Sequence, residues 1–173
     1  MSRKLAREIA FKIVFSNNFQ FEDVETLNTN ETEDLRKTQL LENLIEDRTS
    51  EEDTKNVNDD ISSEDKKYIA EVTQGIAEKI EELDEKIKPY LKGWTMDRIA
   101  KTDLAILRLA VYEIFYREDI PYKVSINEAV ELAKRFDTDD SYTFVNGVLG
   151  AAQKLIAEKK ASAVSVSAEV TNE

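Results

Sequence analysis

The sequence predicts an all-α protein, built as a compact bundle of about six or seven helices. Only 4 glycines and 2 prolines interrupt the 173 residues, so long helices meet few breakers. Apolar residues recur at steps of three or four along much of the chain, which is the period of an amphipathic helix, and no segment alternates as a strand does. A chain of this length can also bury a sizeable core.

The first helix is predicted over about residues 3–19. Its apolar residues share one face at about 100° per residue, and they form the core-facing stripe: Leu5, Ala6, Ile9, Ala10 and Ile13. Arg3, Lys4 and Arg7 are expected on the other side, in solvent. The segment therefore combines a buried apolar face with an exposed basic one.

The strongest charge asymmetry follows this helix. The net charge is −12, and residues 22–65 alone carry four basic and sixteen acidic side chains. A segment of this kind, poor in large apolar residues, is typical of a solvated insertion. We expect a short helix over about 31–47 within an acidic, partly disordered insertion at about 22–61. The predicted organisation is a single helical domain over 1–158 and a flexible C-terminal tail at 159–173.

A further helix is predicted from the serines at 62–63 to Pro89. Serine is favourable at a helix N-terminus, where it caps a free amide, and the two acidic residues that follow complement the helix dipole. The apolar residues then step by three or four: Ile69, Val72, Ile76, Ile80, Leu83 and Ile87. Gly75 inside this helix and Gly147 near the C-terminus each cost about 1 kcal/mol relative to Ala. Both glycines therefore indicate the close approach of a neighbouring helix.

The segment from about 96 to 117 is apolar nearly all round in its middle, which predicts the central and most buried helix. Further on, Ser125 and Glu128 have the spacing of a capping box, in which each side chain caps the amide of the other residue. That spacing predicts a helix over 125–136, and a last helix is expected over about 141–158.

The composition excludes several classes of active site. The chain has no His and no Cys, so it lacks an imidazole base, a thiolate nucleophile and the common zinc ligands. Its glycines form no phosphate-binding or dinucleotide motif, and no apolar run approaches the ~20 residues of a membrane span. The acidic residues Glu128, Glu131 and 137–140 lack the Gly and distal Glu of a calcium loop. We expect no enzyme, no cofactor, no metal and no membrane contact, and a cytoplasmic location.

The basic face of the first helix has two interpretations. Its three cations, with Phe11 and Phe15 nearby, are either an ordinary solvated face or an RNA-binding surface. Cations neutralise phosphates, and aromatic rings stack on unpaired bases. Phe144 is similarly ambiguous, because other apolar residues of the last helix can form its core face and leave Phe144 near the rim.

Four stretches carry a family resemblance. Residues 120–136 read IPYKVSINEAVELAKRF and residues 140–149 read DSYTFVNGVL. Residues 3–10 read RKLAREIA, and residues 103–113 read DLAILRLAVYE. Together they closely resemble the NusB family of bacterial transcription antitermination factors, over the whole chain apart from the acidic insertion and the tail.

The resemblance implies an all-helical fold of two packed helical halves without enzymatic activity. It also implies binding to boxA-type single-stranded RNA together with NusE, a ribosomal small-subunit protein, on the transcribing RNA polymerase complex. The family's RNA-contacting positions map onto six residues: Arg3, Lys4, Arg7, Asp140, Ser141 and Phe144. Its NusE-facing positions map onto Asp103 and onto Phe15, which is usually Tyr in relatives. Phe15 keeps the packing of that ring but loses any hydrogen bond of the hydroxyl.

Two other functions remain open on the sequence. Some rRNA cytosine methyltransferases carry a NusB-like RNA-binding domain, but such an enzyme needs a following Rossmann-like domain, whereas this sequence ends in a low-complexity segment. A helical adaptor between proteins, without an RNA role, is the second alternative. Only an RNA-binding assay with and without the ribosomal partner separates that adaptor from an RNA-binding factor.

Overall fold

The computed structural model describes residues 3–20, 61–136, 140–153 and 156. Every regular element in these ranges is helical, which confirms the all-α prediction. The elements are α1 (Arg3–Gln20), α4 (Ser63–Glu78), α5 (Ile80–Ile87), α6 (Lys101–Tyr116), α7 (Tyr122–Phe136) and a helix over residues 140–153, with short 3-10 turns at Lys88–Tyr90 and Met96–Arg98. The predicted helix over 31–47, nearly all of the acidic insertion and the tail lie outside the described residues.

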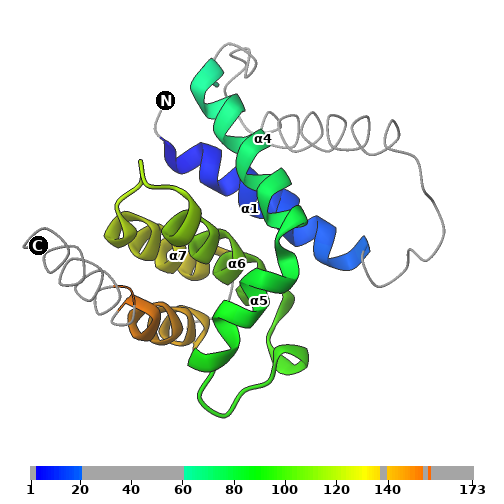
Figure 1. The fold of residues 1–173 in the computed structure, drawn as a ribbon, viewed down its shortest axis with the longest axis vertical. Helices are drawn as coiled ribbons and strands as arrows, with labels where there is room; N and C mark the ends of the chain where they lie inside the picture. Colours follow the sequence, from blue (N-terminus) through cyan, green and yellow to red (C-terminus); the bar gives the residue numbers. More distant parts are fainter. Residues whose placement is uncertain (1–2, 21–60, 137–139, 154–155, 157–173) are drawn as a thin grey trace, which may run out of the picture.

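α6 is the centre of the fold (Figure 1). It packs against α1, α4, α5 and α7, and every residue from Asp103 to Val111 is buried. A helix that is apolar nearly all round satisfies this position because it meets a neighbour on each side. The prediction of a central helix in this segment is confirmed, but α6 begins at Lys101 rather than near Met96, since Ile99 has an extended backbone (ψ 137°).

α1 lies against both α4 and α6. Contact on two sides buries more of this helix than its apolar stripe alone would require, and Phe11 and Val14 are as deeply buried as Ile9. The exposed part of α1 is therefore narrow. This arrangement controls which of its cations reach solvent.

The helix predicted from the serines to Pro89 is broken in two. Ser62 does cap it, since its Oγ accepts a hydrogen bond from the amide of Asp65 at 3.1 Å. At Lys79 the backbone leaves the helical region (φ −117°, ψ 20°), and its amide is shared between the carbonyls of Gly75 and Ile76. The apolar period continues across the break, so the spacing alone could not reveal it.

The two glycines placed in helices differ. A Cβ built on Gly75 would lie 2.1 Å from the hydroxyl oxygen of Tyr112 and 2.4 Å from its Cζ, so α4 approaches α6 as closely as predicted. A Cβ on Gly147 would meet nothing within 4 Å. The prediction of a close approach is confirmed for Gly75 and is wrong for Gly147.

α7 begins at Tyr122, one turn before the predicted capping box. The carbonyl of Pro121 accepts the amides of Val124 and Ser125, which makes Pro121 the residue that caps the start of the helix. Ser125 is consequently inside the helix, 1% exposed, and its Oγ has no hydrogen-bond partner in the structure. The capping role predicted for Ser125 is therefore wrong.

No helix of the described residues has the length and apolar character needed to cross a bilayer.

Candidate nucleic-acid interface

The N-terminal turn of α1 presents two of the predicted RNA-binding cations. Lys4 is exposed. Arg3 is partly exposed, and its guanidinium lies 4.8 Å from the centre of the Tyr68 ring and 3.3 Å from the carboxylate of Asp65. Arg3 is therefore oriented by α4, whereas Lys4 is exposed to solvent.

Arg7 does not share this exposure. It is 4% exposed, and its Nε donates to Oε1 of Glu113 at 2.8 Å, while Glu128 lies 3.9 Å from Nη1. Tyr68 donates its hydroxyl to the same oxygen of Glu113. The predicted solvated position of Arg7 is therefore wrong, because α6 covers that side of α1 and supplies a buried carboxylate for the guanidinium.

The end of α7 adds cations that the sequence analysis did not select. Arg135 is 54% exposed and its Nη1 donates to Oε2 of Glu8 at 2.6 Å, although Glu8 is only 3% exposed. Lys12 lies 3.4 Å from the other oxygen of Glu8. A buried carboxylate thus holds a cation from α1 and one from α7. A surface pocket lies beside them, lined by Lys4, Glu8, Glu128, Glu131, Leu132, Lys134 and Arg135.

The helix over residues 140–153 brings one predicted RNA-binding residue into contact with a predicted partner-binding residue. Ser141 is buried, and its Oγ donates to Oδ1 of Asp103 on α6. Asp140 is exposed beside it. Phe144 is partly buried, and its ring meets that of Trp94 at 5.8 Å in an edge-to-face arrangement. Phe144 therefore lies at the rim of the core, where the sequence analysis placed it.

Phe15 lies apart from these groups. Twelve residues of helix separate it from Arg3, which is about 18 Å along the α1 axis. Its ring is partly buried against the core, 6.2 Å from that of Phe11. Phe15 and the N-terminal cations can therefore serve different ligands at the same time.

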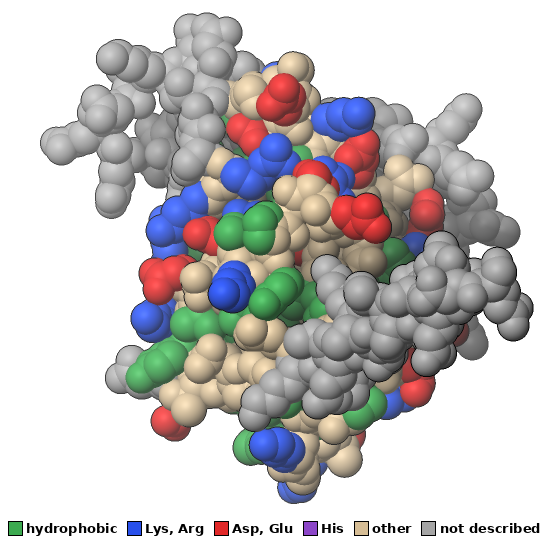
Figure 2. Space-filling model, turned by 60° about the vertical axis from the view of Figure 1, so that its left-hand side comes forward, with side chains coloured by type: hydrophobic (Ala, Val, Ile, Leu, Met, Phe, Trp, Pro, Cys, Tyr) green, Lys and Arg blue, Asp and Glu red, His purple; other side chains and the backbone are tan. Residues whose placement is uncertain are grey.

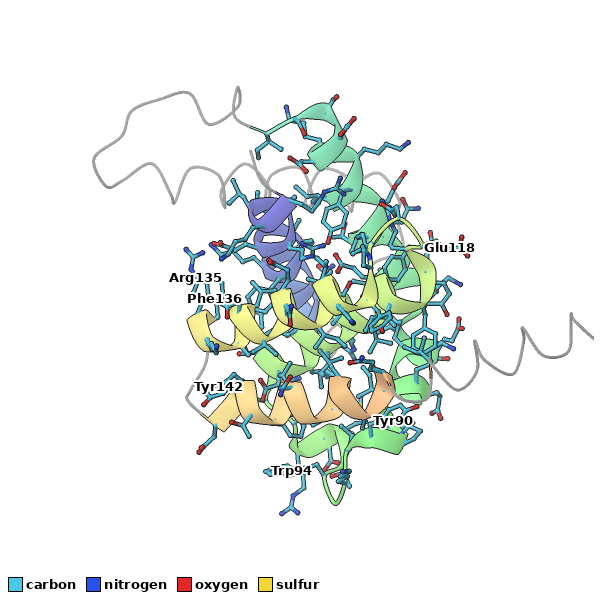
Figure 3. The ribbon with its side chains drawn as sticks, turned by 90° about the vertical axis from the view of Figure 1, so that its left-hand side faces the viewer. Tyr90, Trp94, Glu118, Arg135, Phe136 and Tyr142 are labelled. Carbon is cyan, nitrogen blue, oxygen red and sulfur yellow. The ribbon has the colours of Figure 1, made fainter. Side chains whose placement is uncertain are left out.

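One face of the molecule carries several exposed cations and aromatic rings. Figure 2 shows Lys and Arg side chains along one edge of this face, with acidic side chains between them. In Figure 3, Arg135, Tyr142 and Trp94 follow one another down the same side, from the end of α7 past the 140–153 helix. The ammonium of Lys134 lies 5.5 Å from the centre of the Tyr142 ring. We call this surface the basic–aromatic face.

Two of the acidic residues considered for a metal or for catalysis lie beside cations, and residues 137 and 139 lie outside the described residues. Glu131 pairs with Lys134 at 3.3 Å, and Glu128 lies near Arg7. Among the described residues, no three acidic side chains are arranged to hold a metal ion.

Comparison with known proteins decides the family. A sequence profile described as the NusB family matches residues 4–154. The transcription antitermination protein NusB of Clostridium botulinum (strain Kyoto / Type A2) is 43% identical over 153 residues, which cover 87% of this chain and 98% of that protein. The chain belongs to the NusB family. A NusB from Acetivibrio thermocellus is 39% identical, and the match covers 90% of both proteins.

Solved NusB structures have the same fold. NusB of T. maritima gives a TM-score of 0.67 at 29% identity, covering 89% of this chain and 92% of that one. A structure described as NusB and NusE in complex with dsRNA gives a TM-score of 0.63 at 22% identity and covers 88% of this chain and 96% of that one; at this identity it supports the fold alone. The NusB proteins are non-enzymatic antitermination factors, so the expectation of a NusB-like protein without catalytic activity is confirmed.

Sequence reasoning missed Lys134, Arg135, Tyr142 and Trp94 on the basic–aromatic face of this NusB chain. The only signal was local: Lys134 and Arg135 are the basic pair in the last turn of α7, a position that such residues also favour because they complement the helix dipole. Their proximity to Lys4 and Glu8 depends on tertiary packing.

Proposed function

We propose that this NusB chain is an RNA-binding transcription antitermination factor, which binds boxA-type single-stranded RNA together with NusE on the transcribing RNA polymerase in the cytoplasm. The observation that carries the proposal is the basic–aromatic face of a chain that belongs to the NusB family. Its cations come from α1 and α7 and its rings from the 140–153 helix and the turn before α6. A surface that binds single-stranded RNA needs cations that neutralise its phosphates and, beside them, aromatic rings that stack on its bases.

The residues divide the work by exposure. Lys4 and Arg3 neutralise phosphates at the start of α1, and Asp140 and Phe144 contact the RNA at the start of the last helix. Ser141 orders that end through its hydrogen bond to Asp103. Arg7 acts indirectly, since its buried pair with Glu113 holds α1 on α6 and so keeps Lys4 at the surface.

NusE is the proposed protein partner, because the chain belongs to the NusB family, whose NusE-facing positions map onto residues of this chain. The partner surface includes Phe15 and the acidic Asp103. Because Asp103 is 7% exposed and is bonded to Ser141, it contributes to that surface mainly by fixing the backbone around it.

The first prediction concerns RNA binding itself. We expect a weak affinity for single-stranded boxA RNA that rises when NusE is added. Three or four neutralised phosphates predict a slope of about −2 to −3 in log affinity against log salt. Fluorescence anisotropy of labelled RNA over a salt series, with and without NusE, measures both. Binding of NusE without any binding of RNA would favour the protein adaptor instead.

The second prediction assigns the cations. Lys4→Ala combined with Lys134→Ala should weaken RNA binding by a similar factor for all sequences, because phosphate contacts carry little base information. The salt slope should become shallower by roughly 0.7 for each phosphate that is no longer neutralised. Arg135 is left unchanged because its removal would uncover the buried Glu8.

The matched control removes two exposed cations from α4, Lys66→Ala with Lys67→Ala, which gives the same change in net charge. If both double variants weaken binding equally, the effect is one of total charge, and the basic–aromatic face is not the binding surface.

A further inference from the structure

Trp94 is the single tryptophan of the chain and the most exposed large hydrophobic side chain of the described residues, at 55%. Aromatic side chains dominate core and interface energetics because they bury a large area. An indole left half in water contributes little of that area to folding. An exposed indole of this kind is therefore a candidate contact for a ligand.

The backbone fixes Trp94 in place. Lys92 and Gly93 both have positive φ (36° and 89°), and the amide of Trp94 donates to the carbonyl of Leu91 at 3.0 Å. Leu91 itself is 3% exposed and anchors the turn in the core. The turn thus presents the indole from a defined position.

Phe144 leaves part of the indole available. The two ring planes are inclined by 62°, with their centres 5.8 Å apart. An indole has two faces, and one edge-to-face neighbour covers at most one of them. A flat ring can therefore stack on Trp94 without displacing Phe144.

The charges around Trp94 suit an RNA ligand. Lys92 and Arg98 are exposed on the same short segment. The ammonium of Lys134 lies over the ring of Tyr142, at the start of the 140–153 helix. With one acidic residue, Asp97, between Lys92 and Arg98, this segment keeps a net positive charge that can pair with phosphates beside a stacked base.

We propose that Trp94, supported by Phe144, is a stacking site for one unpaired base of single-stranded RNA. This inference rests on the proposed function, because it extends the RNA path beyond α1 and α7 to the turn before α6. Stacking is tolerant of base identity, so Trp94 adds affinity more than sequence preference.

The intrinsic fluorescence of Trp94 tests the proposal directly, because no other indole contributes to the emission. Unlabelled single-stranded boxA RNA is titrated into the unchanged protein, and binding is followed separately by anisotropy of labelled RNA. The emission should be quenched with the same midpoint as the anisotropy change. RNA binding without any change in emission would overturn the stacking site and leave the proposed function standing.

Variants measure its contribution. Trp94→Ala should lower RNA affinity roughly 5- to 150-fold, the range for loss of one stacked base, whereas Trp94→Phe should keep most of it. The control is Val124→Ala, which removes another exposed apolar side chain (40%). Val124 lies in the first turn of α7, whereas Lys134 and Arg135 of the basic–aromatic face lie in its last turn. Circular dichroism and Tm should change little in all three, since neither side chain belongs to the buried core.

Two results would overturn the inference. One is equal RNA affinity of Trp94→Ala and Val124→Ala. The other is quenching by NusE in the absence of RNA with no further quenching by RNA, which would make Trp94 a protein contact. Failure of the unchanged protein to bind RNA at all would instead overturn the proposed function, and with it the stacking site.

Discussion

Arg7→Ala should cost about 3–5 kcal/mol of unfolding free energy, the typical cost of removing one partner of a buried ion pair. The substitution leaves Glu113 1% exposed without the guanidinium that neutralises it. Tyr68 cannot replace Arg7, because a phenol is never a cation; burial and the neighbouring Glu113 carboxylate raise its pKa and keep it neutral. Urea denaturation followed by circular dichroism measures the loss.

Arg3→Ala is the matched control for Arg7→Ala, because it removes the same side chain one turn earlier on α1. Arg3 is partly exposed, and the buried Asp65 keeps the hydrogen bond that Ser62 donates to its carboxylate, so loss of this ion pair should cost less than ~1 kcal/mol. A second test combines Arg7→Ala with Glu113→Gln, which removes the unpaired charge and should recover part of the stability. A loss below ~1 kcal/mol for Arg7→Ala would contradict the role of this pair. Well below the Tm, folded Arg7→Ala should lose less RNA affinity than the variant with Lys4→Ala and Lys134→Ala, because Arg7 acts on RNA only through the position of α1.

Gly75→Ala should destabilise the protein by about 1–3 kcal/mol, the usual cost of overpacking. The new Cβ would overlap the Tyr112 ring. That ring cannot simply swing aside, because it is packed against the core and lies 5.3 Å from the ring of Tyr116. Thermal and urea unfolding of the purified variant measure the change.

Gly147→Ala is the matched control, because this helical glycine has open space around it and the substitution should stabilise the protein. It should stabilise by up to ~1 kcal/mol through helix propensity alone. The two alanine variants should therefore differ by about 1–4 kcal/mol. Adding Tyr112→Ala to Gly75→Ala should relieve the overlap, while Tyr112→Phe should not, because Cζ and Cε2 remain. Equal stabilities of the two glycine variants would show that α4 and α6 can move apart at little cost, and would contradict the predicted overlap with Tyr112.

Much of the fold could be predicted from the sequence because the apolar period reports directly on helices. The central position of α6 followed from its apolar middle, and the start of α4 followed from Ser62. The break at Lys79 could not be predicted, since a kinked helix keeps the same period. The start of α7 was misplaced because Ser125 has the spacing of a cap, while Pro121 provides the actual start.

The candidate site was less predictable because its parts meet only in three dimensions. A helical projection of α1 distinguishes apolar from charged residues, and it therefore placed Arg7 in solvent. Only the packing of α6 reveals that Glu113 lies on that side. Likewise, nothing near Arg135 in the sequence indicates that its partner is Glu8.

The contact of Glu8 with Arg135 and Lys12 has a consequence for the evolution of the family. One buried carboxylate balances two cations, so losing the acid leaves two like charges facing each other, and losing both cations leaves a buried charge alone. Positions 8 and 135 are 127 residues apart along the chain, yet neither can change sign independently. Among aligned relatives they should therefore covary, with an acid at 8 retained wherever a cation stands at 135.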